Sequence, residues 1–232
     1  MKKIGIIGAM ELEVAALKSH MKISSTTTRA SMEFVEGTLN SVDVVVVQCG
    51  IGKVNAALCV QILADLFHVT HIINTGVAGS LDNDLNIGDI LISKDAIHHD
   101  MDVSALGYPL GQVPGLSSLS FMADASMIDA AVDSCRRVNP EINVKVGRVV
   151  SGDQFISSKE VKEHLIQNFH GQCAEMEGAS IAHGATLNNI PFVIIRAISD
   201  KADDSAEMDY PSFEKAAAAH CDKLVEDFIT HI

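Results

Sequence analysis

Two charged residues of opposite sign follow a run of apolar residues near the C-terminal end of the chain. Arg196 and Asp200 stand four residues apart in Pro191–Asp200, whose apolar and β-branched residues predict a buried parallel strand. In open α/β sheets, ligands bind outside the carboxyl ends of the strands. The two charges therefore either ionise a ligand at this strand end or form an ion pair that only stabilises the fold.

Acidic residues stand at two further places where a predicted strand gives way to a helix. Glu11 and Glu13 follow the first strand, and Glu175-Met176-Glu177 follows a short strand later in the chain. Glu11 and Glu13 face different ways on a helix, so only one of them can point into a cleft. A carboxylate can accept both hydroxyls of a ribose while a methionine packs against the sugar. As first-turn residues, these carboxylates would equally be ordinary helix-stabilising groups.

Two more segments indicate a flat ligand. Asn74–Gly79 runs from a strand into glycines, which either let the backbone approach a flat ligand or form a tight turn. Ser151–Ile156 follows another strand and contains Phe155, whose ring either stacks on a base or fills the core. Gly5 and Gly8 lack the third glycine of a dinucleotide fingerprint, which disfavours a dinucleotide-binding oxidoreductase.

The composition limits the class of protein. The chain has 232 residues, 47% apolar and 4% aromatic with no tryptophan, which predicts one α/β domain with an aliphatic core. Its formal charge of −13 argues against nucleic acid or an anionic membrane as the main partner. The five cysteines are scattered without a C-x-x-C pair, as in a reducing compartment. No apolar run has the length of a membrane span or signal peptide, so we expect a cytoplasmic protein.

Alternating strand and helix patterns predict the architecture. The expected strands cover residues 3–8, 32–38, 42–49, 70–75, 89–96, 144–150, 172–175 and the run that ends at 200. The expected helices cover residues 10–20, 52–67, 124–137, 159–169, 178–187 and a last stretch from about 212. This order predicts a three-layer α/β/α fold, a single domain over residues 1–232, with a mixed, mainly parallel central sheet.

A segment rich in glycine and proline, from His98 to Ser120, has no predicted helix or strand. Its length and its apolar residues Val103, Leu106 and Pro114 favour a contact with a second copy of the chain, and an ordered surface loop is the alternative. The two adjacent histidines at its start point apart on an extended chain, so we expect no metal site.

Taken together, these segments resemble the 5′-methylthioadenosine/S-adenosylhomocysteine nucleosidase family of the purine nucleoside phosphorylase-like superfamily. The shared motifs are Ile4–Met10 with Glu13, Gly50–Val54, Asn74–Gly76, Ser151–Asp153 with Phe155-Ile156, Glu175–Glu177 and Arg196–Asp200. The likeness covers essentially the whole chain. It implies a nucleoside phosphorylase-like fold and a hydrolase of methionine salvage, without a cofactor, that cleaves the N9–C1′ bond of an adenine thionucleoside.

The resemblance also implies a role for each site residue. Asp200 would protonate adenine N7, and Glu13 would activate the water that attacks C1′, with Arg196 and Glu175 fixing that water. The backbone of Ile156 would hold the adenine edge. Phe155 would stack on the adenine ring, Met176 and Glu177 would bind the ribose, and Ile51 and Phe213 would contact the 5′ end. Four further residues are implied to contact the substrate: Ala9, Val77, Gly79 and Ser199. Val103, Leu106 and Pro114 would join the 5′ wall from the neighbouring subunit of a homodimer.

Two residues depart from the family pattern. Val77 stands where a serine hydroxyl often bonds the catalytic aspartate, and Ser199, next to Asp200, is the available substitute. Leu106 stands where an aromatic residue is frequent, which bears on the preferred 5′ substituent.

Three rival functions stay open. A nucleoside phosphorylase has the same fold but needs a cationic phosphate pocket near the first strand, where this chain has Glu11 and Glu13. A futalosine-type nucleosidase is not separated by these motifs. A non-catalytic adenosine-binding sensor would use the same binding residues and release no adenine.

Overall fold

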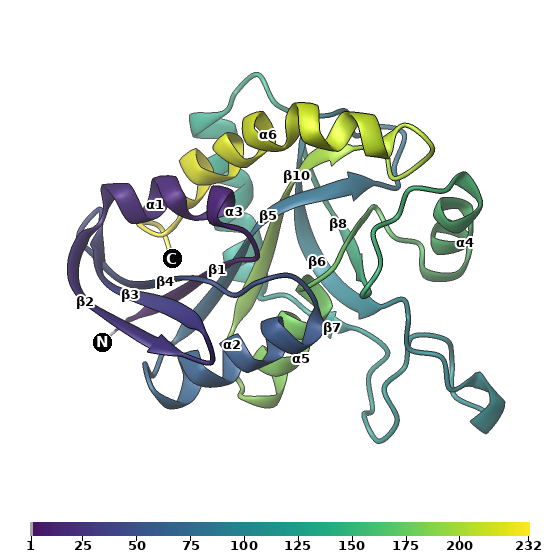
Figure 1. Ribbon diagram of the computed structural model, residues 1–232, viewed down its shortest axis with the longest axis horizontal. Helices are drawn as coiled ribbons and strands as arrows, with labels where there is room; N and C mark the ends of the chain where they lie inside the picture. Colours follow the sequence, from purple (N-terminus) through teal and green to yellow (C-terminus); the bar gives the residue numbers. More distant parts are fainter. Residues whose placement is uncertain (1) are drawn as a thin grey trace.

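The computed structural model describes residues 2–232. Its strands are β1 (Ile4–Gly8), β2 (Lys22–Arg29), β3 (Met32–Leu39), β4 (Val42–Gln48), β5 (His71–Ser80), β6 (Ile90–His98), β7 (Phe121–Met122), β8 (Val144–Ser151), β9 (Cys173–Glu175) and β10 (Phe192–Asp200). Its α-helices are α1 (Ala15–His20), α2 (Lys53–Asp65), α3 (Ala125–Val138), α4 (Lys159–Phe169), α5 (Gly178–Leu187) and α6 (Ala206–Phe228). Two short 3₁₀ turns, η1 (Glu11–Glu13) and η2 (Ser104–Leu106), complete the chain (Figure 1).

All ten strands belong to one mixed sheet, as predicted. The order is β10-β6-β8-β9-β5-β1-β4-β3-β2, with β7 on β6. Strand β10 pairs in parallel with β5 and antiparallel with β6. The sheet therefore curls until five strands close into a ring, whereas β1, β4, β3 and β2 extend from it as an open sheet. The alternation of strands and helices along the chain does not predict this closure, because the closure depends on the pairing of β10 with both β5 and β6.

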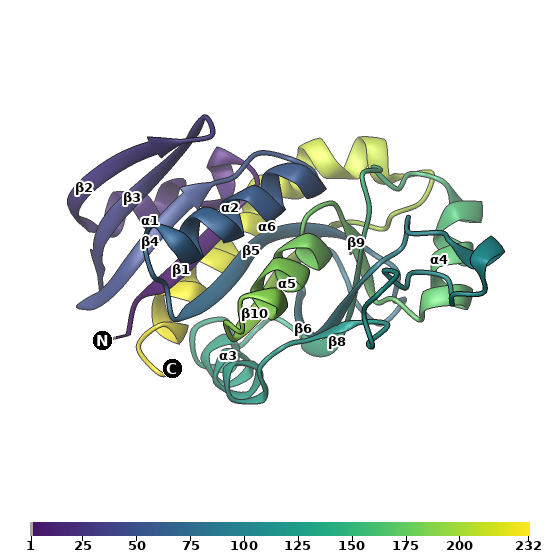
Figure 2. The same cartoon turned by 90° about the horizontal axis from the view of Figure 1, so that it is seen from below.

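Helices cover both faces of the sheet, in agreement with the predicted three layers. Alternate residues of β10 show the two faces: Ile194 packs in a core with α2 and α5, whereas Val193 and Ile195 pack in a core with α1, α3 and α6. Helices α2 and α5 lie side by side on one face, and the long α6 crosses the other (Figures 1 and 2). Mostly aliphatic side chains fill both cores, as the composition predicted.

Two helices have a side chain that caps their first turn. The Asp124 carboxylate accepts a hydrogen bond from the N–H of Met127 at 3.0 Å at the start of α3. The Ser158 hydroxyl accepts one from Val161 at 3.4 Å at the start of α4. Both side chains satisfy amides that have no partner within the helix.

The predicted helix over residues 10–20 is interrupted. Residues Glu11–Glu13 form a single 3₁₀ turn, Val14 leaves the helical region with φ −132° and ψ −10°, and α1 starts at Ala15. The break follows from Glu13, whose carboxylate folds back onto the amides of Ala9 and Met10. A regular helix from residue 10 would carry Glu13 away from these amides.

Three further boundaries differ from the sequence-based prediction. Strand β5 continues through its glycines to Ser80, so these glycines lie in the sheet and form no turn. Helix α6 begins at Ala206, earlier than expected, with Pro211 inside it. Strand β2 was not predicted because its Ser/Thr-rich residues are nearly all exposed and show no alternation; it forms as the partner of β3 at the edge of the sheet.

The segment between β6 and β7 contains only the turn η2 and projects from the body of the molecule (Figure 1). The lack of regular structure there agrees with the sequence. In residues 2–232, none of the helices combines the length and the apolar character needed to cross a bilayer.

Helix α6 carries a buried carboxyl group at Asp222. The side chain of Asp222 is buried, and its Oδ1 atom has no hydrogen-bond partner among the described residues. Burial, reinforced by the nearby Glu226, raises the pKa of Asp222 to about 7. An ionised Asp222 therefore destabilises the folded state.

We expect Asp222→Asn to stabilise the protein increasingly as the pH rises above about 4, with most of the gain reached by about pH 7. The folded state keeps the Asp222 proton up to about pH 7, whereas the unfolded chain releases it near pH 4, so this group removes stability as the pH rises between these values. Because the variant does not lose this stability, its free energy of unfolding should exceed that of the wild type by about 1–3 kcal/mol at pH 8 and be almost equal to it at pH 4. Urea unfolding at both pH values measures the difference, and an equal gain at both would contradict a buried ionisation.

Candidate active site

A cavity of about 330 Å³ opens where several strands of the sheet end. It is lined by Ala9, Met10, Glu13, Ile51, Val77, Ala78, Gly79, Phe155, Ala174, Glu175, Met176, Glu177, Ser199, Asp200 and Tyr210. A smaller hollow of about 30 Å³ adjoins it and adds Gln154, Ile156 and Ala202. The parallel strands β1, β5 and β10 all end at this cavity, as expected for a ligand site in an α/β fold.

The fold brings together most residues that the sequence singled out. Ala9, Glu13, Ile51, Val77, Gly79, Phe155, Glu175, Met176, Glu177, Ser199 and Asp200 line the cavity, and Ile156 lines the adjoining hollow. Arg196 is fully buried behind the wall. Phe213, Val103, Leu106 and Pro114 do not line the cavity of their own chain.

Tyr210 lines the cavity, whereas Phe213, three residues further along α6, does not. The ring of Tyr210 packs edge-on against Phe155, with ring centroids 5.7 Å apart, and its hydroxyl donates to the Met10 sulfur at 3.2 Å. Sequence reasoning missed Tyr210 because it placed this residue in a loop before the helix. The signal was the three-residue spacing between Tyr210 and Phe213, which puts both aromatic rings on one side of α6.

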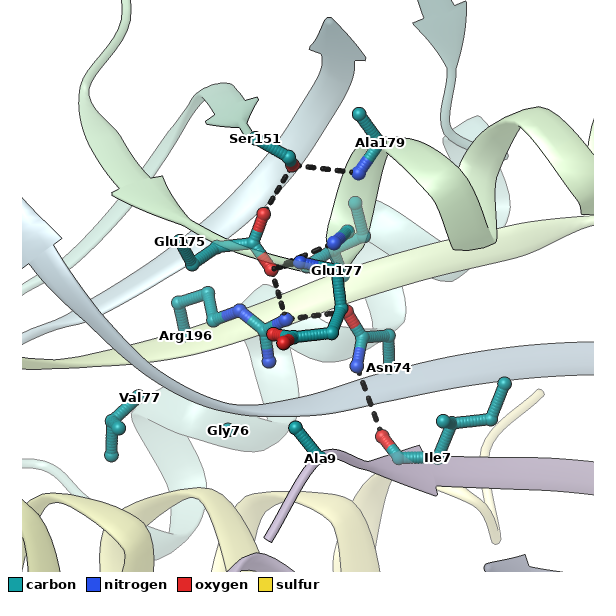
Figure 3. A network of polar contacts seen from close by, with 12 residues as sticks. Ile7, Ala9, Asn74, Gly76, Val77, Ser151, Glu175, Glu177, Ala179 and Arg196 are labelled. Atoms are coloured by element: carbon teal, nitrogen blue, oxygen red, sulfur yellow. Dashed lines mark hydrogen bonds and ion pairs between the residues drawn. The ribbon is translucent and has the colours of Figure 1, made fainter. Parts of the chain in front are cut away.

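The buried Arg196 organises the floor of the cavity (Figure 3). Its Nη2 donates to Asn74 Oδ1 at 2.6 Å and to Glu175 Oε2. Asn74 in turn donates to the carbonyl of Ile7 at 3.0 Å, which ties β5 to β1. Burial would lower the pKa of Arg196, but Glu175, Glu13 and Glu177 outweigh it and raise this pKa. The guanidinium is therefore a permanent positive charge among three carboxyl groups.

Gly76 makes room for the charged groups. It lies directly opposite Arg196 in the register of β5 and β10. A Cβ atom at position 76 would lie 2.4 Å from Glu13 Oε1 and 2.5 Å from Arg196 Nη1. Both side chains pass over the bare backbone, so any larger residue at this position would displace Glu13 or Arg196.

Glu13 is held as an acceptor by three backbone amides. Its Oε2 accepts from Ala9 at 2.7 Å and Met10 at 3.0 Å, and its Oε1 accepts from Val77 at 3.0 Å. Burial raises the pKa of Glu13, while Arg196 and these three amides oppose the shift. The result is a fixed carboxylate with a higher proton affinity than a carboxylate in water.

A bulge in β10 brings Ser199 and Asp200 into the same cavity. Successive residues of a strand normally face opposite sides, but the register with β5 shifts between Ile198 and Asp200. Asp200 Oδ2 accepts from the Ser199 hydroxyl at 2.8 Å, and Oδ1 accepts from the amide of Ala202 at 2.8 Å. The hydroxyl that Val77 lacks is thus supplied by Ser199.

The environment of Asp200 favours its protonated form. Burial raises the pKa of Asp200, although the hydrogen bonds from Ala202 and Ser199 act in the opposite direction. The nearby acidic residues Asp209 and Asp203 add to the rise. This carboxyl group is therefore suited to hold and donate a proton.

Two helix N-termini hold the other two glutamates. Glu175 Oε2 accepts from the amides of Glu177 at 3.1 Å and Gly178 at 2.7 Å, at the start of α5. Glu177 Oε1 accepts from the amide of Gly52 at 2.8 Å, at the start of α2. Helix N-termini favour negative charge. Burial, with Glu175 as the next cause, nevertheless raises the pKa of Glu177 to about 7.

The charged groups on the cavity wall are all acidic. Glu13, Glu175, Glu177 and Asp200 line it, and among residues 2–232 no lysine, arginine or histidine does. The described part of the chain also holds no cluster of His, Cys, Asp and Glu side chains suited to a metal ion. Such a wall favours a ligand that becomes positively charged and repels an anion.

The side of the cavity near Asp200 suits a flat ring. Phe155 is about half exposed at the edge of the cavity, so one part of its ring is available for stacking. Neither the amide nor the carbonyl of the adjacent Ile156 makes a hydrogen bond within residues 2–232. A heterocycle can thus find a stacking partner and free backbone groups beside an acid.

Comparisons with known proteins agree with this geometry. The profile of the Phosphorylase superfamily matches residues 3–230. The 5′-methylthioadenosine/S-adenosylhomocysteine nucleosidase of Geobacillus sp. (strain WCH70) is 40% identical over 231 residues, 99% of each chain. The Neisseria meningitidis enzyme of that name, solved with methylthio-immucillin-A, is 37% identical, covers 100% of both chains and has a TM-score of 0.96.

A futalosine hydrolase of Helicobacter pylori strain 26695 is also similar, at 32% identity and a TM-score of 0.94, covering 100% of this chain and 98% of that one. The identity to it is lower than to the two nucleosidases over an equal share of the chain. The fold is thus the nucleoside phosphorylase-like fold. The chain belongs to the 5′-methylthioadenosine/S-adenosylhomocysteine nucleosidase family of the phosphorylase superfamily.

Proposed function

We infer that this protein hydrolyses the N-glycosidic bond of 5′-methylthioadenosine and S-adenosylhomocysteine, releasing adenine and the corresponding thioribose in methionine salvage. Full-length identity to nucleosidases supports the substrate class, and the match over residues 3–230 supports a single nucleosidase domain. The observation that carries the reaction type is the all-acidic cavity wall, with a proton-holding carboxyl group and an amide-held carboxylate in one cavity.

Asp200 is the general acid in this proposal. Adenine is a poor leaving group as an anion, so a proton must reach N7 as the N9–C1′ bond breaks. The raised pKa of Asp200 keeps this proton available, and Ser199 and Ala202 orient the carboxyl group. The electron pair of the broken bond passes to the protonated adenine, which leaves as a neutral base.

Glu13 is the general base. Its three amide donors fix the carboxylate, and its raised pKa makes it a stronger proton acceptor than an exposed glutamate. Glu13 takes a proton from water as the water oxygen bonds to C1′. Arg196 holds Glu175, and through it the neighbouring wall, in place for this attack. A transition state with positive charge on the ribose is stabilised by the surrounding carboxylates.

The remaining residues bind the substrate. Glu177, held by the start of α2, accepts ribose hydroxyls, and Met176 packs on the sugar. Phe155 stacks on adenine, and the free backbone groups of Ile156 bind its edge. Tyr210 joins Ile51 in enclosing the site.

A phosphorylase reaction is disfavoured by the same wall. Inorganic phosphate needs cationic or amide donors at its binding site. Here Arg196, which lies behind the wall, is committed to Glu175 and Asn74, and the amides of Ala9, Met10 and Val77 are committed to Glu13. Water therefore fits the attacking position better than phosphate.

A direct assay tests the reaction. We expect adenine release from methylthioadenosine and adenosylhomocysteine at the same rate with and without phosphate, with free thioribose as the second product. Inosine and a futalosine-type nucleoside should react at least about 100-fold more slowly in kcat/KM. Phosphate-dependent release with a sugar phosphate as product would identify a phosphorylase. Faster cleavage of the futalosine-type nucleoside would identify that hydrolase instead.

Carboxamide variants test the two catalytic roles. Asp200→Asn and Glu13→Gln should each lower kcat by about 10²–10⁴-fold, because each removes one proton-transfer group. Binding of a non-hydrolysable thionucleoside, measured by calorimetry, should stay within about tenfold of wild type. Glu11→Gln is the matched control, since Glu11 is exposed and pairs with Lys18 at 2.9 Å. A sensor would bind the ligand in all four proteins and show no turnover in the wild type.

The protein acts as a homodimer in this proposal. Val103, Leu106 and Pro114 do not line their own cavity, and they belong to the projecting segment between β6 and β7 (Figure 1). Leu106 is 75% exposed in the single chain, so its apolar surface is available for a contact with a second copy. Contact with a second copy would bury Leu106 and close the 5′ end of that copy's cavity.

Leu106→Glu should weaken this dimer. We expect at least about a tenfold rise in the dimer dissociation constant in analytical ultracentrifugation, because a charge replaces a buried contact. KM for methylthioadenosine should rise in parallel as the 5′ wall is lost. Ile23→Glu is the control, since Ile23 is 57% exposed on the edge strand β2. An unchanged dimer together with an unchanged KM would contradict the assignment.

A further inference from the structure

Two chain segments that line the cavity meet the start of the projecting segment at a cluster outside the cavity wall. The three segments are the start of α2 at Lys53, the start of the projecting segment at Asp100, and the loop after β8 at Asp153. None of these three residues lines the cavity or bonds Glu13 or Asp200. The proposed chemistry therefore makes no use of them.

The three residues form a closed cycle of hydrogen bonds. Lys53 Nζ donates to Asp100 Oδ1 at 2.6 Å, and the amide of Asp153 donates to Asp100 Oδ2 at 3.1 Å. The cycle closes where the amide of Lys53 donates to Asp153 Oδ1 at 2.8 Å. Asp100 thus uses both carboxylate oxygens, one for each of the other two segments.

Each of these two segments leads directly to a substrate contact. Next to Lys53, the amide of Gly52 holds Glu177, and Ile51 lines the cavity. Gly52 has φ +97°, and a Cβ there would lie 3.0 Å from Asp153 Oδ1, so the approach of the two segments depends on glycine. Beyond Asp153, Phe155 and Ile156 line the adenine side of the site.

The ion pair within the cycle is partly shielded from water. The side chains of Lys53 and Asp100 are 23% and 18% exposed. Burial alone would raise the pKa of Asp100, but the hydrogen bonds from Lys53 and from Asp153 lower it below its ordinary value. A charge pair that is both hydrogen-bonded and partly buried holds its geometry better than an exposed one.

We propose that Asp100 is a positioning residue that sets the ribose-binding segment at Gly52 at the correct distance from the adenine-binding segment at Phe155. This role rests on the proposed nucleosidase function. A ligand that spans both segments depends on the cycle, whereas adenine alone touches one segment. Since the cycle does not touch Glu13 or Asp200, it acts on binding of the nucleoside and leaves the chemical step unchanged.

The test compares Asp100→Ala with Asp100→Asn and with Glu36→Ala as a matched control. Glu36 accepts from Lys3 at 2.6 Å and is similarly half-buried, but the hollow it lines shares no residue with the cavity. We expect Asp100→Ala to raise KM for methylthioadenosine about tenfold with kcat within about twofold of wild type. Asp100→Asn keeps an acceptor for the Asp153 amide and should raise KM about threefold. Glu36→Ala should change neither constant.

Calorimetry separates this role from a loss of folding and from failure of the proposed function. In Asp100→Ala, the dissociation constant of a non-hydrolysable thionucleoside should rise about tenfold and that of adenine less than about twofold. Equal effects on both ligands, a fall in kcat at constant KM, or the same constants in Asp100→Ala as in Glu36→Ala would overturn the proposal.

Lys53→Met should raise KM as Asp100→Ala does, and Lys53→Arg should not. If the wild type binds the thionucleoside but releases no adenine, the nucleosidase assignment fails while the binding test of Asp100 still stands.

Discussion

A single buried guanidinium balances the acidic cavity on which the rest of the site depends. Arg196 is 1% exposed and donates to Glu175 and Asn74, and the carboxyl groups of Glu175, Glu13 and Glu177 raise its pKa against the effect of burial. Removing one partner of such a buried pair typically costs about 3–5 kcal/mol, because the remaining charge is uncompensated. Arg196 lowers the pKa of Glu13 and of Glu177, so its removal would favour the protonated form of the proposed base.

The backbone supplies the other half of this electrostatic arrangement. Amides at the ends of β1 and β5 hold Glu13, and the starts of α5 and α2 hold Glu175 and Glu177. These donors are fixed by the sheet and the helices, so they need no reorganisation when charge develops on the ligand. Asp200 differs because it has fewer opposing donors and further acids nearby, and it keeps a proton. One cavity thus holds an acid and a base among similar carboxyl groups.

Much of the fold could be predicted from residue patterns. The Val-rich β4 and the helices α3 and α4 follow from local apolar patterns, and the mixed sheet between helices follows from the order of these elements along the chain. The break after Glu13 and the bulge at Ser199 could not be predicted in this way, since both arise from contacts between distant segments. Tyr210 was missed for the same reason, because its place depends on where α6 begins.

The sequence by itself determined the kinds of groups at the site, the strand ends that carry them and, through its ordered motifs, the family. Only the tertiary structure decided which of these groups have shifted proton affinities. Burial and neighbours set the direction of every pKa shift in the cavity, and these depend on which segments pack together. Gly76 illustrates the difference: its sequence position left open a tight turn or a close approach to a flat ligand, whereas its place opposite Arg196 shows that it makes room for two charges to meet.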